Sequence, residues 1–118
     1  MRIFKKEIQM TIIEYMNHKR IFNSLDGLKS KNSSVLSVAF QYGFFSQEYY
    51  CEMFHQVIGV SPSEYRSFLN HSIGLKQETI FIIQDKISYL DSFFRKVDEY
   101  SKNVPTLQTV KVLSIFKK

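Results

Sequence analysis

The chain has 118 residues, of which 44% are hydrophobic, and its net charge is +5. This is enough apolar sequence for one packed domain with an appendage, and it argues against a disordered chain. No apolar stretch approaches the roughly 18 residues of a membrane span, no signal peptide opens the chain, and a single cysteine, Cys51, excludes an internal disulfide. These features predict a cytoplasmic protein, and the basic charge favours an anionic partner.

A long helix is predicted over residues 11–29. Thr11 and Glu14 have capping-box spacing at its start, and Gly27 weakens its last turn by about 1 kcal/mol relative to alanine. The apolar residues form two stripes, which predicts contacts on two sides of the helix. One stripe contains Ile13, Ile21, Leu25 and Leu28, and the other contains Ile12, Tyr15 and Phe22.

Two short helices joined by a tight turn are predicted next, over residues 34–58. An apolar helical pattern that begins at Val35 stops at Gly43, a residue type that tolerates the positive φ of such a turn. Ser46 is placed to cap the second helix, and Gly59 is placed to end it. The second helix has an apolar stripe for the core, formed by Tyr50, Met53, Phe54, Val57 and Ile58. Its opposite face carries Gln47, Glu48, Cys51, Glu52, His55 and Gln56.

A third helix start follows, with Ser61 and Glu64 at capping-box spacing and Pro62 at the first helical position. Further on, apolar residues alternate at spacings of three and four and predict an amphipathic helix over about 77–102. We call this series the C-terminal seam: Ile80, Ile83, Ile87, Leu90, Phe94 and Val97. A strand over 79–83 is the alternative, because that run is rich in β-branched residues. The tail over 107–116 is irregular or strand-like.

The order of several of these residues resembles the second helix-turn-helix of the AraC/XylS transcription regulators. The residues that carry the resemblance are Ala39, Tyr42-Gly43-Phe44, Ser46-Gln47, Phe54, Gly59, Ser61-Pro62 and Tyr65-Arg66. Upstream, Phe4-Lys5-Lys6-Glu7, Glu14-Tyr15-Met16 and Lys19-Arg20-Ile21 resemble the end of that family's first recognition helix and the start of its linker helix.

The resemblance implies a mainly α, homeodomain-like fold. Residues 1–68 would form a truncated DNA-binding domain, with one complete helix-turn-helix over 34–66 and most of the first one missing. Residues 69–118 would be an extension. In the family the linker helix lies between two helix-turn-helix units, so one of its stripes here needs another cover. Either the C-terminal seam folds back onto Ile12, Tyr15 and Phe22, or these surfaces serve a homodimer or heterodimer.

The resemblance also implies double-stranded DNA as the partner. Candidate contacts from the second helix are Ser46, Gln47, Glu48, Cys51, Glu52 and His55. Candidate phosphate contacts are Lys5, Lys6, Lys19, Arg20 and Lys31. Arg2 falls where the family has a DNA-contacting arginine, and it either keeps that contact or belongs to a frayed basic N-terminus. Gln47 is suited to adenine, and Glu48 or Glu52 to cytosine N4.

The charge distribution weighs against a simple DNA-binding interpretation. Residues 1–31 have a net charge of +4, residues 32–66 of −2, and residues 67–118 of +3. The family commonly has an arginine at the position of Glu52 and a lysine at that of His55. The polar face is therefore either a base-reading face or an ordinary solvated one.

No enzymatic grouping is apparent. His18, His55 and His71 have no metal-ligand spacing with Cys51, and there is no glycine-rich phosphate loop. We therefore expect no metal, no cofactor and no enzyme. Three hypotheses remain: a sequence-specific DNA-binding regulator, an interaction protein that pairs with a full-length family regulator, and a gene remnant without a retained function.

Overall fold

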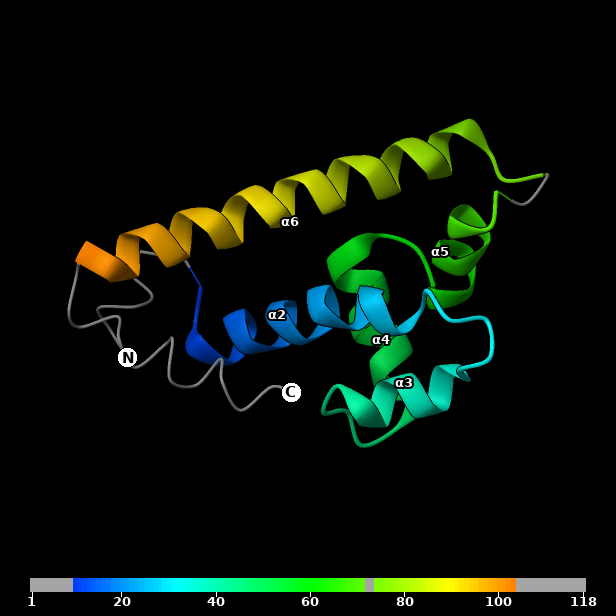
Figure 1. The fold of residues 1–118 in the computed structure, drawn as a ribbon, viewed down its shortest axis with the longest axis horizontal. Helices are drawn as coiled ribbons and strands as arrows, with labels where there is room; N and C mark the ends of the chain where they lie inside the picture. The colour runs from blue at the N-terminus through cyan, green and yellow to red at the C-terminus, as the bar shows by residue number, and fades with distance from the viewer. Residues whose placement is uncertain (1–9, 72–73, 104–118) are drawn as a thin grey trace.

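A computed structural model describes residues 10–71 and 74–103, and these ranges form five α-helices (Figure 1). The mainly α fold predicted from the sequence is confirmed. Arg2, Lys5, Lys6 and the tail over 107–116 lie outside the described residues. The helices are α2 (Ile12–Gly27), α3 (Val35–Gln41), α4 (Gln47–Ile58), α5 (Pro62–Leu69) and α6 (Gln77–Asn103).

The helix starts lie where the capping signals predicted them. At α2 the Thr11 backbone N–H donates to Glu14 Oε1 at 2.8 Å, and the Glu14 N–H donates to Thr11 Oγ1 at 3.0 Å. At α4 the Ser46 hydroxyl accepts a hydrogen bond from the Tyr49 N–H at 3.0 Å. α5 begins with the second capping box, at Ser61. These bonds satisfy N–H groups that have no partner inside the helix.

The two predicted glycine turns are confirmed as well. Gly43, between α3 and α4, and Gly59, at the end of α4, both have φ of +95°. Residues other than glycine rarely adopt this backbone conformation. The two glycines therefore determine how the chain turns into α4 and out of it.

Helix α2 lies at the centre of one continuous core. Ile21, Leu25 and Leu28 are buried as predicted, but Ile13 is 71% exposed, so its assignment to the same stripe was wrong. The reason is tertiary: α3 and α4 lie along the C-terminal half of α2 and leave the side of its first turn open (Figure 1). The buried apolar residues are Tyr15, Ile21, Leu25, Leu28, Val38, Ala39, Phe44, Tyr50, Phe54, Val57, Ile58, Val60, Tyr65, Ile83, Leu90, Phe94 and Val97.

The core contains one buried polar pair between α2 and α4. The Ser24 hydroxyl donates to the Ile21 carbonyl at 2.7 Å and lies 2.8 Å from the Tyr50 hydroxyl. Because the serine proton is used in the first bond, the tyrosine is the donor in the second. Burial raises the pKa of Tyr50 well above its ordinary value, so the phenol stays protonated and can fill this role.

Helix α6 runs back over α2 and α4 in the direction opposite to α2 (Figure 1). Four residues of the C-terminal seam are buried, namely Ile83, Leu90, Phe94 and Val97. The Phe94 ring lies 5.6 Å from the Tyr15 ring and 5.2 Å from the Phe22 ring. The helical interpretation of this segment is thus confirmed, and in the monomer the seam folds back onto the second stripe of α2. No helix in the described ranges is long and apolar enough to cross a membrane.

Candidate nucleic-acid interface

Helix α4 has one buried and one exposed face, as its sequence predicted. Of the predicted stripe, Met53 is half-buried against the core, and the other four residues, Tyr50, Phe54, Val57 and Ile58, are buried in it. The opposite face exposes Gln47, Glu48, Glu52, His55 and Gln56. The hydroxyl of Ser46 accepts the capping hydrogen bond from the Tyr49 N–H, and its own O–H is left to donate at the surface.

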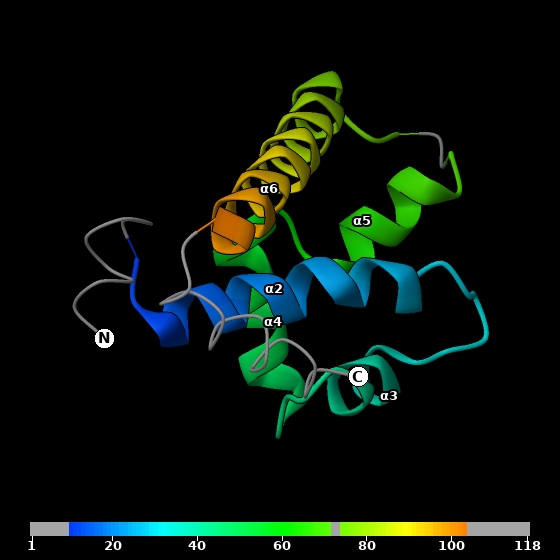
Figure 2. The same cartoon turned by 60° about the vertical axis from the view of Figure 1, so that its left-hand side comes forward.

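The N-terminal end of α4 is the open end of this helix. It follows the turn from α3, and α3 lies on the side of α2 and α4 away from α6 (Figure 2). The C-terminal end lies against α6, where a Cβ atom at Gly59 would stand only 2.8 Å from Ile82 Cγ2. Helix α6 therefore covers the core without covering the first turn of α4.

Cys51 lies at the edge of the exposed face and is half-buried. Burial raises the pKa of its thiol, and the charge of Glu48 raises it further. A protonated, half-buried thiol is a weak nucleophile and suits packing or a van der Waals contact.

The cations proposed for phosphate contacts lie in different surroundings. Lys31 is exposed in the loop between α2 and α3. Arg20 lies against the turn of the helix-turn-helix, with its Nε buried and 3.3 Å from where a Cβ at Gly43 would stand. Lys19 is half-buried, its Nζ 4.5 Å from the centre of the Phe94 ring. Burial lowers the pKa of Lys19, and Asp98 partly offsets this. Its ammonium is thus held between α2 and α6.

The one cation of residues 32–66, Arg66, has a structural role that the sequence did not reveal. Its Nε donates to the Leu28 carbonyl at 3.1 Å, and an Nη donates to the Ser30 carbonyl at the same distance. The guanidinium thereby satisfies carbonyls at the end of α2 and in the following loop. The exposed face of α4 is consequently left with its glutamates and without an arginine of its own segment.

Two aromatic residues at the start of α4 were missed by the sequence analysis. Phe45 immediately precedes the capping serine and is 95% exposed, and Tyr49 is 43% exposed. Tyr49 is three residues before Glu52 and seven before Gln56, so helical spacing was the signal that placed it on the outer face. For Phe45 the signal was its position beside a cap in a pair of adjacent phenylalanines, of which the structure buries only Phe44.

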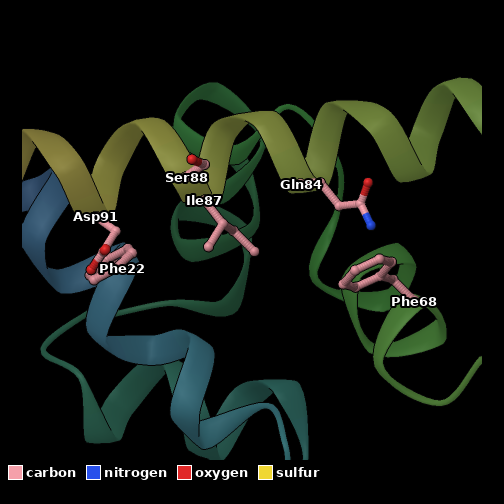
Figure 3. A pocket seen from close by; sticks show the side chains of 6 residues that line it. All are labelled: Phe22, Phe68, Gln84, Ile87, Ser88 and Asp91. Atoms are coloured by element: carbon pink, nitrogen blue, oxygen red, sulfur yellow. The ribbon is translucent and has the colours of Figure 1, made fainter.

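A second surface feature is an open groove between α2, α5 and α6, about 400 Å³ in volume (Figure 3). Its carboxylate, Asp91, pairs with Arg95 at 2.9 Å. Within the described ranges, no group of three or more His, Cys, Asp or Glu side chains is arranged to hold a metal ion. The groove offers mainly apolar contacts, and its lining consists of Phe22, Phe68, Gln84, Ile87, Ser88 and Asp91.

Comparison with known proteins places the helix-turn-helix among relatives. A family model described as a helix-turn-helix domain matches residues 1–67. The HTH-type transcriptional activator AarP of Providencia stuartii is 35% identical over 65 residues, which are 55% of this chain and 48% of AarP. The HTH-type transcriptional activator RhaR of Mannheimia succiniciproducens is 32% identical over 66 residues, 56% of this chain and 24% of RhaR.

YijO of Escherichia coli, an uncharacterized HTH-type transcriptional regulator, is 36% identical over 77 residues, 65% of this chain and 27% of YijO. The chain thus spans about half of AarP and about a quarter of the two longer relatives. No solved structure matches significantly. The family match extends over more than half of the sequence and agrees with the capped helices and glycine turns described above, and the chain belongs to the AraC/XylS family of transcription regulators.

Proposed function

We propose that the chain is a sequence-specific DNA-binding transcription regulator that inserts α4 into the major groove. The observation that carries the proposal is the division of α4 into a buried face and an exposed polar face, with its N-terminal end free of α6. In helix-turn-helix proteins the N-terminal residues of the second helix contact base edges. The relatives AarP and RhaR are named as transcriptional activators, which agrees with this role.

Base reading is assigned to the first two turns of α4. The carboxamide of Gln47 matches the N6 and N7 edge of adenine, and the carboxylates of Glu48 and Glu52 match the N4 amino group of cytosine. All three side chains are exposed. Cys51 and His55 flank them and would supply further contacts along the same face.

Phosphate contacts must come from outside α4, because its face is acidic. Arg20, which lies against the turn before α4, and Lys31, which is exposed in the loop between α2 and α3, are the described cations that we assign to these contacts, and Arg2, Lys5 and Lys6 would add to them. Lys19 is the weakest candidate, because moving its ammonium to a phosphate means leaving the Phe94 ring.

The test is a titration of the full chain against duplexes selected from a random pool, at about 50 and about 200 mM salt. We expect the logarithm of the binding constant to fall with the logarithm of salt, by about 0.9 per phosphate contacted. Gln47→Ala should weaken discrimination at one base position by about 1–3 kcal/mol. The matched control is Gln84→Ala, an exposed glutamine on α6, which should change nothing.

Lys31→Ala should reduce the salt slope by about 1 and leave the base preference intact. Lys96→Ala, an exposed lysine on α6, is its control. Binding without salt dependence, or an unchanged base preference in Gln47→Ala, would contradict the proposal.

The acidic face of α4 favours a second candidate, an interaction protein that pairs with a full-length family regulator and modulates it. In the structure Tyr15 and four residues of the C-terminal seam are buried within the chain, so a partner at those residues would have to displace α6. A stable complex with such a regulator, together with no duplex binding by the chain alone, would favour this candidate over the first.

A further inference from the structure

Phe45 occupies an unusual place at the start of α4. The residue before a helix cap commonly packs against the residue four positions into the helix, which here is Tyr50. Instead Phe44 makes this contact, with its ring 5.1 Å from the Tyr50 ring, and is 3% exposed. Phe45 is left 95% exposed, the highest value among the large apolar side chains that the structure describes.

Tyr49 lies at the same end of the helix and is held in place. Its ring is 5.9 Å from that of Phe44, at an interplanar angle of 50°, and its backbone N–H donates to Ser46. Phe45 and Tyr49 therefore flank the capping serine as two exposed rings. They adjoin Gln47 and Glu48, the residues proposed above to meet base edges.

We propose that Phe45, with Tyr49 beside it, reads thymine through the C5-methyl group in the major groove. This inference rests on the proposed function, because it uses the same end of α4. Thymine is the base that presents a methyl group on the major-groove edge, and phenylalanine is one of the side chains suited to contact it. An apolar contact also needs no cation, which agrees with a helix whose exposed face carries Glu48 and Glu52.

Duplex DNA is a better occupant of this site than another protein. The two rings continue directly into the polar face of α4, so one ligand can contact the apolar and the hydrogen-bonding residues together.

The experiment removes the methyl group from the DNA and the ring from the protein in turn. Each thymine of the selected duplex is replaced singly by uracil, which keeps every hydrogen-bonding atom and lacks only the methyl group. We expect one such replacement to weaken binding of the unmodified protein about fourfold, the value of one buried methyl group. In Phe45→Ala the thymine duplex should bind more weakly, and uracil at that position should have no further effect.

Two variants control for structure and chemistry. Phe45→Leu keeps an apolar contact and should retain part of the preference for thymine over uracil. Phe81→Ala removes a ring that is 66% exposed on α6, and it should leave the preference unchanged. Because the Phe45 ring is almost fully exposed, Phe45→Ala should fold normally, which far-UV circular dichroism checks.

Each contrary result has a distinct meaning. Salt-dependent binding with no effect of uracil at any position would overturn the inference and leave the proposed function standing. A uracil effect equal in Phe45→Ala and the unmodified protein would assign the methyl contact to another side chain and also overturn it. Loss of self-association in Phe45→Ala, without a uracil effect, would assign the ring to a protein contact. No salt-dependent binding to any duplex would overturn both proposals.

Discussion

Replacing Phe94 with alanine tests how strongly the packing of α6 against α2 stabilises the fold. The Phe94 side chain is 5% exposed and is packed between the rings of Tyr15 and Phe22. Truncation of a buried phenylalanine to alanine typically costs about 3–5 kcal/mol, through lost burial and the cavity left behind. Lys19 also loses the ring under its ammonium. Because domains of this kind are stable by only about 5–15 kcal/mol, we expect Phe94→Ala to remove a large share of the free energy of unfolding.

Urea denaturation, followed by far-UV circular dichroism at two protein concentrations, measures this loss. Phe94→Leu keeps most of the apolar volume and should cost less than about 1.5 kcal/mol. The matched control is Phe81→Ala on the same helix, which should stay within about 0.5 kcal/mol of the unmodified protein. Equal losses of unfolding free energy in Phe94→Ala and Phe81→Ala, or a loss below about 1 kcal/mol in Phe94→Ala, would contradict the packing of Phe94 against α2. A midpoint that moves with protein concentration would place α6 on a second copy instead.

Three further predictions concern single side chains. Burial raises the pKa of Tyr50 above its ordinary value of about 10, so the free energy of unfolding should be unaffected by this group below pH 10 and should fall above it by up to about 1.4 kcal/mol per pH unit. In thermal unfolding, Tyr50→Phe should reduce this alkaline slope. Gly27→Ala should destabilise the protein by about 1–3 kcal/mol in urea unfolding, despite better helix propensity, because its Cβ would stand 2.7 Å from Tyr42 Cε2; a stabilised variant would contradict this packing. The raised pKa of the Cys51 thiol should make its reaction with a disulfide reagent slow at pH 8, and Glu48→Gln should accelerate it; an unchanged rate would leave burial as the only cause.

Local signals explain why so much of the fold could be predicted from the residues. The capping serine Ser46 and the positive-φ glycines Gly43 and Gly59 depend on a few neighbouring atoms, and each behaves as expected. The helical period of the C-terminal seam likewise predicted its buried side, although whether it would pack within the chain or between chains depends on the whole surface of α2.

The features that the sequence did not predict depend on contacts between residues that are distant in the chain. Ile13 has the spacing of a core residue, but α3 and α4 do not extend to it. From the sequence Lys19 is a free surface cation, and only the structure shows that Phe94, 75 positions further along the chain, lies under its ammonium. Phe44 and Phe45 are adjacent and chemically identical, and it is the packing around Tyr50 that puts one in the core and leaves the other in solvent.

Gly27 illustrates how a correct local argument can be incomplete. A glycine in the last turn of a helix has a propensity cost, as the sequence suggests. The structure supplies the compensating benefit, since the absent side chain leaves room for the ring of Tyr42 from the end of α3.

The bond from Arg66 to the Leu28 carbonyl joins residues 38 positions apart. This hydrogen bond connects α5 to the end of α2 and so ties the two ends of the helix-turn-helix segment together. The exposed loop between α2 and α3 is therefore not an independent hinge, because it can move away from α5 only when the hydrogen bonds from Arg66 break. In hydrogen exchange, the segment from Leu28 to Arg66 should open as one cooperative unit.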